Sequence, residues 1–246
     1  MKSISYLFSL VWRFWLLCAF ILVFFIFLPP LFFFTAIMKN NKNVNHVSKY
    51  WSKFALLFSG IFWKVRFKEK LNPKQTYIFC ANHTSSLDIP LIKAIIPLPL
   101  LYIGKKELVK IPVFGYFYKH NSVIVDRKNL KDSYQAFLKA GEKLEQGLNI
   151  CIFPEGGIPK KSIFLKKFKN GAFKLSLEKN ISIVPITIAD VKYKFPQEYY
   201  KGFPGIIRVT VHKPIKPDSI KEKSIKNLNS SVYNTIFEEL TSYENK

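Results

Sequence analysis

The sequence predicts an α/β protein with a mostly parallel central sheet flanked by helices, preceded by an N-terminal hydrophobic membrane-associated helical segment. Three observations predict this class. Short apolar runs of strand length alternate with runs of helical length and spacing, which is typical of a largely parallel sheet. The 246 residues suffice for one sizeable domain with an appendage. The appendage is the N-terminal stretch, where a long apolar run carries no charge.

The expected elements follow from apolar periodicity along the chain. The expected strands lie at 77–81, 100–104, 122–126, 149–153, 182–189 and 206–212. The expected helices lie at 87–96, 130–146, 170–178 and 222–243, and Gly147 is suited to end the second of them. We therefore divide the chain into N-terminal membrane-anchoring helices at 1–64 and an α/β domain at 65–246.

The N-terminal run is long enough to cross a bilayer. No charged residue occurs from Phe14 to Met38. A straight helix of these residues would be about 37 Å long. A secretory signal peptide is the competing interpretation, but the apolar part is too long and no small-residue cleavage site follows it. Pro29-Pro30 should kink or break the helix, so the segment either spans once or enters the bilayer and returns. Lysines are more frequent after this run than before it, which favours a cytoplasmic body.

Residues 44–63 carry an apolar and aromatic stripe at helical spacing. The stripe consists of Val44, Val47, Tyr50, Trp51, Phe54, Leu57, Phe58 and Ile61. It either lies on the membrane surface or packs on the protein core, and the sequence leaves both open. Residues 65–75 then look like the connection to the α/β domain.

The charge balance indicates an anionic partner. Lysine and arginine exceed aspartate and glutamate by 38 to 16, a net charge of +22. Nucleic acid, anionic lipid and an acidic carrier protein would each satisfy this excess, and lysines around an apolar anchor favour lipid over nucleic acid. The cysteines Cys18, Cys80 and Cys151 have neither pairing nor metal-ligand spacing, which indicates free thiols in a reducing compartment and no metal site.

His83 and Asp88 form the candidate catalytic pair. They follow the expected strand 77–81, where the chain turns into the expected helix 87–96. Residues five apart are separated by roughly 140° around a helix, so the two side chains meet only if His83 lies on the loop and Asp88 in the first helical turn. Thr84, Ser85 and Ser86 would then cap that helix, and backbone N–H groups at 84–87 are candidates to stabilise an oxyanion. An imidazole held by a carboxylate is a general base, although such a pair is also common by chance.

Other polar residues lie near the ends of the later strands. Ligand sites of open α/β sheets collect at such ends, so these residues would share one crevice with the pair. They are two cations, Lys105 and Arg127, the carboxylate of Glu155, and the Gly156-Gly157 turn. Arg127 is either a surface charge or a forked phosphate ligand, and the glycines either form a plain turn or let backbone approach a ligand. Lys160 and Lys161 are either solvated or line the site.

The ordered set of these short motifs resembles the glycerolipid acyltransferase family, whose bacterial members include 1-acyl-glycerol-3-phosphate acyltransferase. The resemblance covers roughly residues 50–215. Its motifs are Asn82-His83 with Asp88, the stretch from Lys105 to Gly115, Val125-Asp126-Arg127, Phe153-Pro154-Glu155-Gly156, Phe168-Lys169-Asn170-Gly171-Ala172 and Val184-Pro185-Ile186. One motif alone is weak, whereas the ordered set is specific.

This resemblance implies transfer of a fatty acyl group from acyl-CoA or acyl carrier protein to the free hydroxyl of 1-acyl-glycerol-3-phosphate, giving phosphatidic acid. His83 would be the base and Asp88 its orienting partner. The implied substrate-binding residues are Asn82, Lys105, Arg127, Glu155, Gly156 and Gly157. The resemblance implies acyl-CoA or acyl carrier protein as the co-substrate. It implies no cofactor and no metal.

The sequence departs from the family after Phe153-Pro154-Glu155-Gly156. The family usually continues with Thr-Arg, and its arginine is credited with phosphate binding, whereas this chain has Gly157-Ile158. The acceptor therefore stays open between lysophosphatidic acid and another acceptor, such as glycerol-3-phosphate or an ornithine lipid. A non-catalytic, basic membrane-binding protein on the same fold is the alternative from another class.

Overall fold

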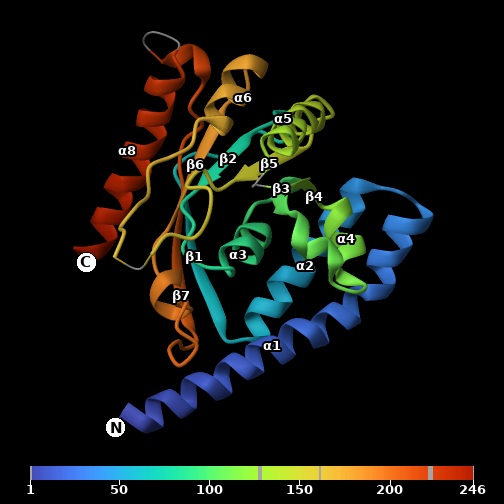
Figure 1. The fold of residues 1–246 in the computed structure, drawn as a ribbon, viewed down its shortest axis with the longest axis vertical. Coiled ribbons are helices and arrows are strands. Elements are labelled where there is room, and N and C mark those ends of the chain that lie inside the picture. Colours follow the sequence, from blue (N-terminus) through green and yellow to red (C-terminus); the bar gives the residue numbers. More distant parts are fainter. Residues whose placement is uncertain (1, 127–128, 161, 221–223, 246) are drawn as a thin grey trace.

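A single mixed sheet organises the part of the chain that the computed structural model describes, residues 2–126, 129–160, 162–220 and 224–245. Its strand order is β1-β7-β6-β2-β5-β3-β4 (Figure 1). The strands are β1 (Ile61–Phe67), β2 (Ile78–Ala81), β3 (Leu100–Lys105), β4 (Ser122–Val125), β5 (Asn149–Ile152), β6 (Ile183–Ile188) and β7 (Gly205–Val211). Neighbouring strands run parallel, except that β7 runs antiparallel to β6. The expected α/β class with a mostly parallel sheet is confirmed.

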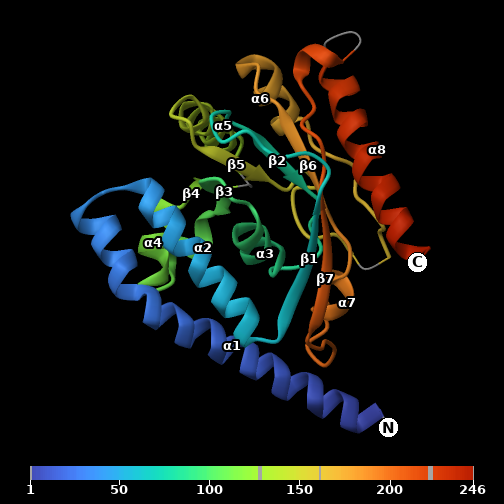
Figure 2. The same ribbon diagram turned by 180° about the vertical axis from the view of Figure 1, so that it is seen from behind.

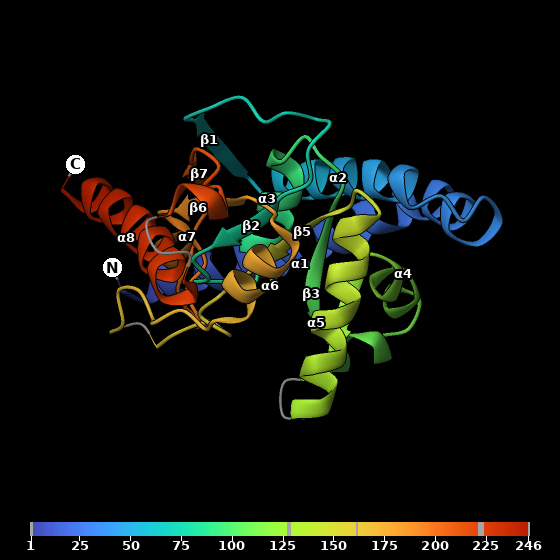
Figure 3. The same cartoon turned by 90° about the horizontal axis from the view of Figure 1, so that it is seen from above.

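Helices cover both faces of this sheet. They are α1 (Lys2–Phe32), α2 (Asn41–Phe58), α3 (Asp88–Ile95), α4 (Phe114–His120), α5 (Leu130–Glu145), α6 (Gly171–Lys179), α7 (Val191–Lys194) and α8 (Ile225–Glu244). Figure 3 shows α2 and α3 on one side of the central strands and α5 and α6 on the other. Successive side chains of a strand point to opposite faces, so β2 contributes Phe79 to one core and Ile78 to the other. Because both faces are covered, β2 and β6 are buried along their whole length.

Two elements differ from the sequence-based expectation. The helix expected up to residue 63 ends at Phe58, and the chain turns at Gly60, whose φ of +74° favours glycine. Residues Ile61–Phe67, expected as the end of this helix and a connection, form β1 and pair with β7. Helix α4 was not among the helices expected from sequence, and its Phe117 packs against Phe24 of α1. Both elements are short and depend on a partner that is distant in sequence.

The N-terminal part forms a helical hairpin that lies along one end of the body (Figures 1 and 2). Helix α1 does not break at Pro29-Pro30; it ends just beyond them in a π-helical turn at Phe33–Ile37, and α2 then packs back against α1. The apolar stripe of α2 is divided between two environments. Val44 and Val47 are buried in a cluster with Leu31, whereas Phe54 and Phe58 are exposed. One helical stretch of the described residues, from Ile4 to Ile37, is long and apolar enough to cross a membrane.

A buried lysine of α3 joins α2 to β3 through hydrogen bonds. Lys93 on α3 is 7% exposed, and its Nζ donates to the side-chain oxygen of Asn45 on α2 and, at 2.7 Å, to the carbonyl of Leu100. The same Asn45 oxygen accepts the backbone N–H of Leu100 at 2.9 Å. Burial lowers the pKa of Lys93 to about 7, because the charged form loses its hydration.

We expect the free energy of unfolding to rise with pH above about 7 because of Lys93. In that range the unfolded chain keeps the Lys93 proton that the folded protein has lost, so stability grows by up to about 1.4 kcal/mol per pH unit. Below the folded pKa both states are protonated and this contribution is constant. Urea unfolding at pH 7 and pH 8.5 measures the slope. Lys93→Met should reduce it, whereas the surface control Lys139→Met on α5 should not; equal slopes in the two variants would contradict the prediction.

Candidate active site

The His83 and Asp88 side chains meet at the carboxyl end of β2. His83 lies on the loop after the strand and Asp88 is the first residue of α3. His83 Nδ1 and Asp88 Oδ2 are 2.9 Å apart. Asp88 is fully buried and the His83 side chain is 10% exposed. This contact occupies Nδ1 and leaves Nε2 as the nitrogen that can exchange a proton with a substrate.

The Asp88 carboxylate also shapes the loop that carries His83. Its Oδ2 accepts the backbone N–H groups of Thr84 at 2.7 Å and Ser85 at 2.9 Å. Of the expected capping oxygens, the Ser85 hydroxyl accepts the backbone N–H of Leu87 at 3.4 Å, and the Asp88 carboxylate reaches back to the N–H of Ser85, which is the reciprocal arrangement of a capping box. One acid thus fixes both the imidazole and the backbone beside it.

Hydrogen bonds within the fold engage three of the four backbone N–H groups expected as oxyanion donors. The N–H groups of Thr84 and Ser85 are taken by Asp88, and that of Leu87 points to the Ser85 hydroxyl at 3.4 Å. Within the described part of the chain, Ser86 is the residue of 84–87 whose N–H has no partner in the fold. Among residues 84–87, the backbone N–H of Ser86 is therefore the remaining candidate to stabilise an oxyanion.

Glu155 supports the His83 loop from the turn that follows the neighbouring strand β5. It is 1% exposed, and its two oxygens accept the backbone N–H groups of His83 at 2.7 Å and Lys166 at 3.0 Å. Burial raises the pKa of Glu155, and the two backbone donors oppose this effect. The ring of Phe153 stacks on the imidazole with centroids 4.0 Å apart. The Glu155 carboxylate is therefore buried and holds the histidine backbone in place, and the substrate-binding role expected for it stays a prediction.

We expect Glu155→Gln to lower both stability and turnover. A glutamine offers one acceptor oxygen and an NH₂ group, so one of the two buried backbone donors loses its acceptor. Leaving such a donor unpaired costs about 1–3 kcal/mol, which is roughly 2–4 °C in melting temperature per kcal/mol for a chain of this size. Thermal unfolding and acyl-transfer assays measure the two effects. Glu178→Gln on the exposed face of α6 is the matched control, and equal melting temperatures for the two variants would contradict this role.

Asn82 ties the loop to the strand on the other side of β2. Its side-chain NH₂ donates to the carbonyl of Ile188 at 2.9 Å, and its oxygen accepts the N–H of Ile188 at 2.8 Å. Asn82 is 1% exposed. Asn82 thus joins β2 to β6, and the substrate contact expected from sequence stays a prediction. Loop and neighbours form a rigid support for His83.

The remaining expected substrate ligands lie at the same sheet edge or outside the described residues. Lys105 is exposed at the end of β3. Gly156 has a φ of +76°, and a Cβ there would approach Lys169 Cε to 2.6 Å, so the Lys169 side chain lies over this turn. Nothing crowds Gly157. Arg127 and Lys161 lie outside the described residues.

Lys169 is a cation that the sequence analysis did not single out for the site. It belongs to Phe168-Lys169-Asn170-Gly171-Ala172, one of the motifs that carry the family resemblance. Its backbone N–H donates to the carbonyl of Pro154 at 2.8 Å, which holds it beside the Glu155 turn. Among the described residues none forms an ion pair with its side chain. A free ammonium beside the Gly156 turn is therefore available to an anionic ligand.

A cavity of about 510 Å³ opens on the other side of the His83 loop, towards α8. Asn82 and Thr84 line it, together with Phe164, Ile188, Ala189, Asp190, Lys192, Tyr193, Arg208, Leu240, Tyr243 and Glu244. Its cations are paired: Arg208 binds Asp190 at 2.7 Å and Lys192 binds Glu244 at 2.9 Å. His83 is not among its lining residues. This cavity therefore differs from the basic crevice expected from sequence.

The sheet and the His-Asp loop define an acyltransferase. The chain belongs to the Acyltransferase family, whose family model matches residues 63–189. The 1-acyl-sn-glycerol-3-phosphate acyltransferase of Cocos nucifera is 31% identical over 150 residues, covering 60% of this chain and 48% of that protein. A probable 1-acyl-sn-glycerol-3-phosphate acyltransferase of Mycoplasma pneumoniae is 30% identical over 184 residues, covering 70% of this chain and 68% of that protein. The chain thus spans about half to two thirds of the length of these relatives.

A solved structure shares the fold over its whole length. The crystal structure of the 1-acyl-sn-glycerophosphate (LPA) acyltransferase PlsC from Thermotoga maritima matches with a TM-score of 0.81 at 22% identity. The match covers 100% of this chain and 99% of that chain, including the N-terminal helices.

Proposed function

We propose that the protein is a membrane-associated O-acyltransferase that acylates the free hydroxyl of 1-acyl-glycerol-3-phosphate and forms phosphatidic acid for phospholipid synthesis. The observation that carries this proposal is the 2.9 Å contact between His83 Nδ1 and the buried Asp88 carboxylate. The names of the relatives support the acceptor. The donor is a fatty acyl thioester, acyl-CoA or acyl carrier protein, and the reaction uses no further cofactor.

In the proposed reaction His83 carries out both proton transfers, and the His83–Asp88 contact supports this role. Nε2 of His83 removes the hydroxyl proton while the hydroxyl oxygen attacks the thioester carbonyl carbon. The new C–O bond gives a tetrahedral intermediate, which collapses as the C–S bond breaks. The leaving thiolate takes the proton from Nε2, so the products are an ester and a free thiol. Asp88 stabilises the imidazolium that exists between the two transfers.

The charge around the Glu155 turn favours a phosphorylated acceptor. Lys169 lies over Gly156, and Lys105 ends β3 at the same edge of the sheet. We assign the acceptor phosphate to these cations together with Arg127, in place of the arginine that the family carries after its Phe-Pro-Glu-Gly motif. Gly156 and Gly157 then let the acceptor approach the backbone of the turn.

The exposed apolar surface of α1 supports placement at a membrane. Phe14, Leu17, Ile21 and Phe25 are about half exposed or more, which is unfavourable in water over so large an area. The lysines that follow α1 favour the cytoplasmic side for the α/β domain. Acceptor and product are lipids, so a site held near the bilayer surface can exchange both.

The direct test is an acyl-transfer assay with the purified full-length chain in detergent micelles. Lysophosphatidic acid is offered with acyl-CoA and, separately, with acyl carrier protein; glycerol-3-phosphate and a lyso-ornithine lipid serve as competing acceptors. Formation of phosphatidic acid at the highest kcat/KM of the panel supports the proposal. A preference for another acceptor would overturn the substrate, and lipid binding without any transfer would overturn the activity.

A further inference from the structure

The apolar helix α1 holds one charged side chain that points into the body of the protein. Arg13 donates to three backbone carbonyls, those of Lys201 at 2.7 Å, Pro196 at 2.5 Å and Glu198 at 3.0 Å. Its guanidinium also lies 4.2 Å from the ring centroid of Phe195. A guanidinium is suited to this task because its fork offers several donors in fixed directions. These bonds join α1 to the segment 195–201, which is more than 180 residues away in sequence.

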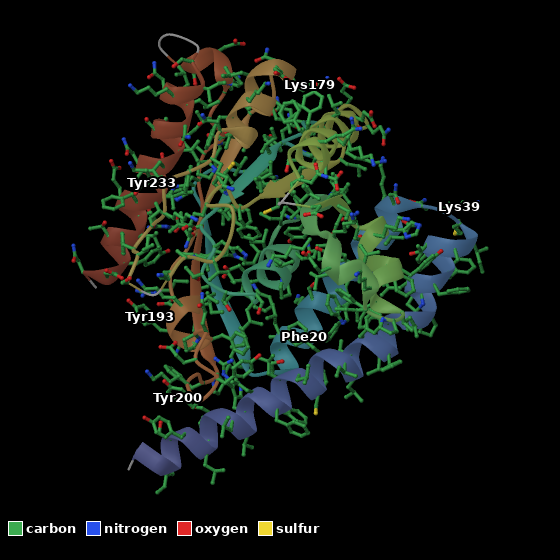
Figure 4. All side chains as sticks on the ribbon, viewed as in Figure 1. Phe20, Lys39, Lys179, Tyr193, Tyr200 and Tyr233 are labelled. Carbon is green, nitrogen blue, oxygen red and sulfur yellow. The ribbon has the colours of Figure 1, made fainter. Side chains whose placement is uncertain are left out.

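Aromatic side chains of α1 complete the docking. Trp12 packs edge-on against Phe195, with centroids 6.0 Å apart, and its Nε1 donates to the carbonyl of Ser59 at 2.9 Å. Tyr6 packs edge-on against Tyr200, with centroids 5.4 Å apart, and Figure 4 shows Tyr200 beside the N-terminal half of α1. The N-terminal half of α1 is thus fixed to the body by these contacts.

The segment that Arg13 holds also contacts the His83 loop. The carbonyl of Phe195 accepts the hydroxyl of Ser85 at 3.1 Å. The backbone N–H of Ser85 donates to Asp88 Oδ2, the same oxygen that contacts His83 Nδ1. Phe195 therefore contacts Arg13 through its ring and Ser85 through its backbone carbonyl. A continuous set of contacts runs from α1 to the His83–Asp88 pair.

We propose that Arg13 is a positioning residue for acyl transfer, and this proposal rests on the function proposed above. By binding the carbonyls of 196–201, Arg13 keeps Phe195 in place, and Phe195 keeps Ser85 and the His83 loop in the geometry that reaction requires. Docking of the apolar helix is thereby coupled to the orientation of the base. Displacement of catalytic groups by about 1 Å can cost as much as 10²-fold in rate, so the effect falls on kcat.

Arg13→Ala tests this coupling, measured in detergent micelles of fixed lipid content so that membrane association does not vary. We expect kcat to fall by about tenfold while KM for acceptor and donor changes less than about threefold, because the substrates do not touch Arg13. Arg13→Lys should restore little, because the three bonds come from two separate nitrogens, Nε and Nη2, and the single ammonium nitrogen of lysine cannot occupy both positions. Arg66→Ala is the matched control: Arg66 is exposed on β1, where it pairs with Glu239, and its loss should leave kcat unchanged.

Ser85→Ala makes the test specific to the proposed route. If Arg13 acts through Phe195 and Ser85, the double variant Arg13→Ala/Ser85→Ala should lose about as much kcat as the stronger single variant. Additive losses would overturn the route. A lower melting temperature with unchanged kcat would reduce Arg13 to a purely structural residue and overturn the proposal.

Hydrogen exchange separates this proposal from the proposed function. In Arg13→Ala the amides of 83–88 should exchange faster than in the wild-type protein, while those of β7 keep their protection. This readout requires no activity, so it stands if the wild-type protein fails to transfer acyl groups. Unchanged exchange at 83–88 would overturn the coupling even in an active enzyme.

Discussion

Replacing His83 by alanine should abolish most acyl transfer while the protein stays folded. A positioned general base contributes typically 10²–10⁴-fold, and we expect kcat/KM to fall by a factor in this range. The fold should survive because the loop does not depend on the imidazole. Asp88 keeps its two backbone donors at Thr84 and Ser85, and Glu155 binds the backbone of residue 83 whatever its side chain.

The measurement pairs turnover with thermal unfolding. His83 stacks on Phe153, and loss of this contact should lower the melting temperature by only a few degrees, on the order of 1 kcal/mol. His120→Ala, the same change on the exposed surface of α4, should affect neither quantity. Full turnover in folded His83→Ala would remove the base from the mechanism, and with it the proposed reaction.

Asp88→Asn should lower kcat strongly but less than His83→Ala. Asparagine has the shape of aspartate, and its oxygen can still accept the N–H groups of Thr84 and Ser85, so the loop is retained. It cannot stabilise the imidazolium by charge, and Asp88 is fully buried, where water does not compensate for a lost charge. We therefore expect a loss of about 10²-fold in kcat, the lower end of the range for a general base, with KM nearly unchanged.

Asp88→Ala distinguishes the two roles of this residue. Alanine removes the acceptor of two backbone N–H groups as well as the charge, and each buried donor left without a partner costs about 1–3 kcal/mol. Asp88→Asn should thus affect mainly kcat, whereas Asp88→Ala should also lower the melting temperature. If both variants lost stability equally and kept equal kcat, Asp88 would be a structural residue alone.

Most of the fold could be predicted because the strands of a covered parallel sheet are continuous apolar runs. β2 and β6 are buried on both faces, and their apolar character is visible in the sequence alone. β1 could not be predicted in this way. It is an edge strand whose residues are mostly exposed, it follows an aromatic helix directly, and only pairing with β7, about 140 residues later, makes it a strand.

The His83–Asp88 pair of the candidate site could be predicted from the sequence. The contacts of the other polar residues at this sheet edge could not. His83 and Asp88 are recognisable from their position at a strand end, and the structure brings them together. Glu155 and Asn82 look like ligands in sequence because they are polar and lie at the same edge. The structure shows both buried and hydrogen-bonded to backbone groups, which no local pattern reveals, and their substrate contacts stay predictions.

The sequence by itself therefore determined the α/β class, the long apolar N-terminal helix and the histidine–aspartate pair, because each depends on periodicity or spacing within a few residues. Only the tertiary structure decided which polar groups hold the His83 loop, and that Arg13 of α1 binds the segment beside Ser85. These outcomes depend on contacts between segments far apart in the chain. A polar group that is buried there loses its hydration and must form a hydrogen bond within the protein.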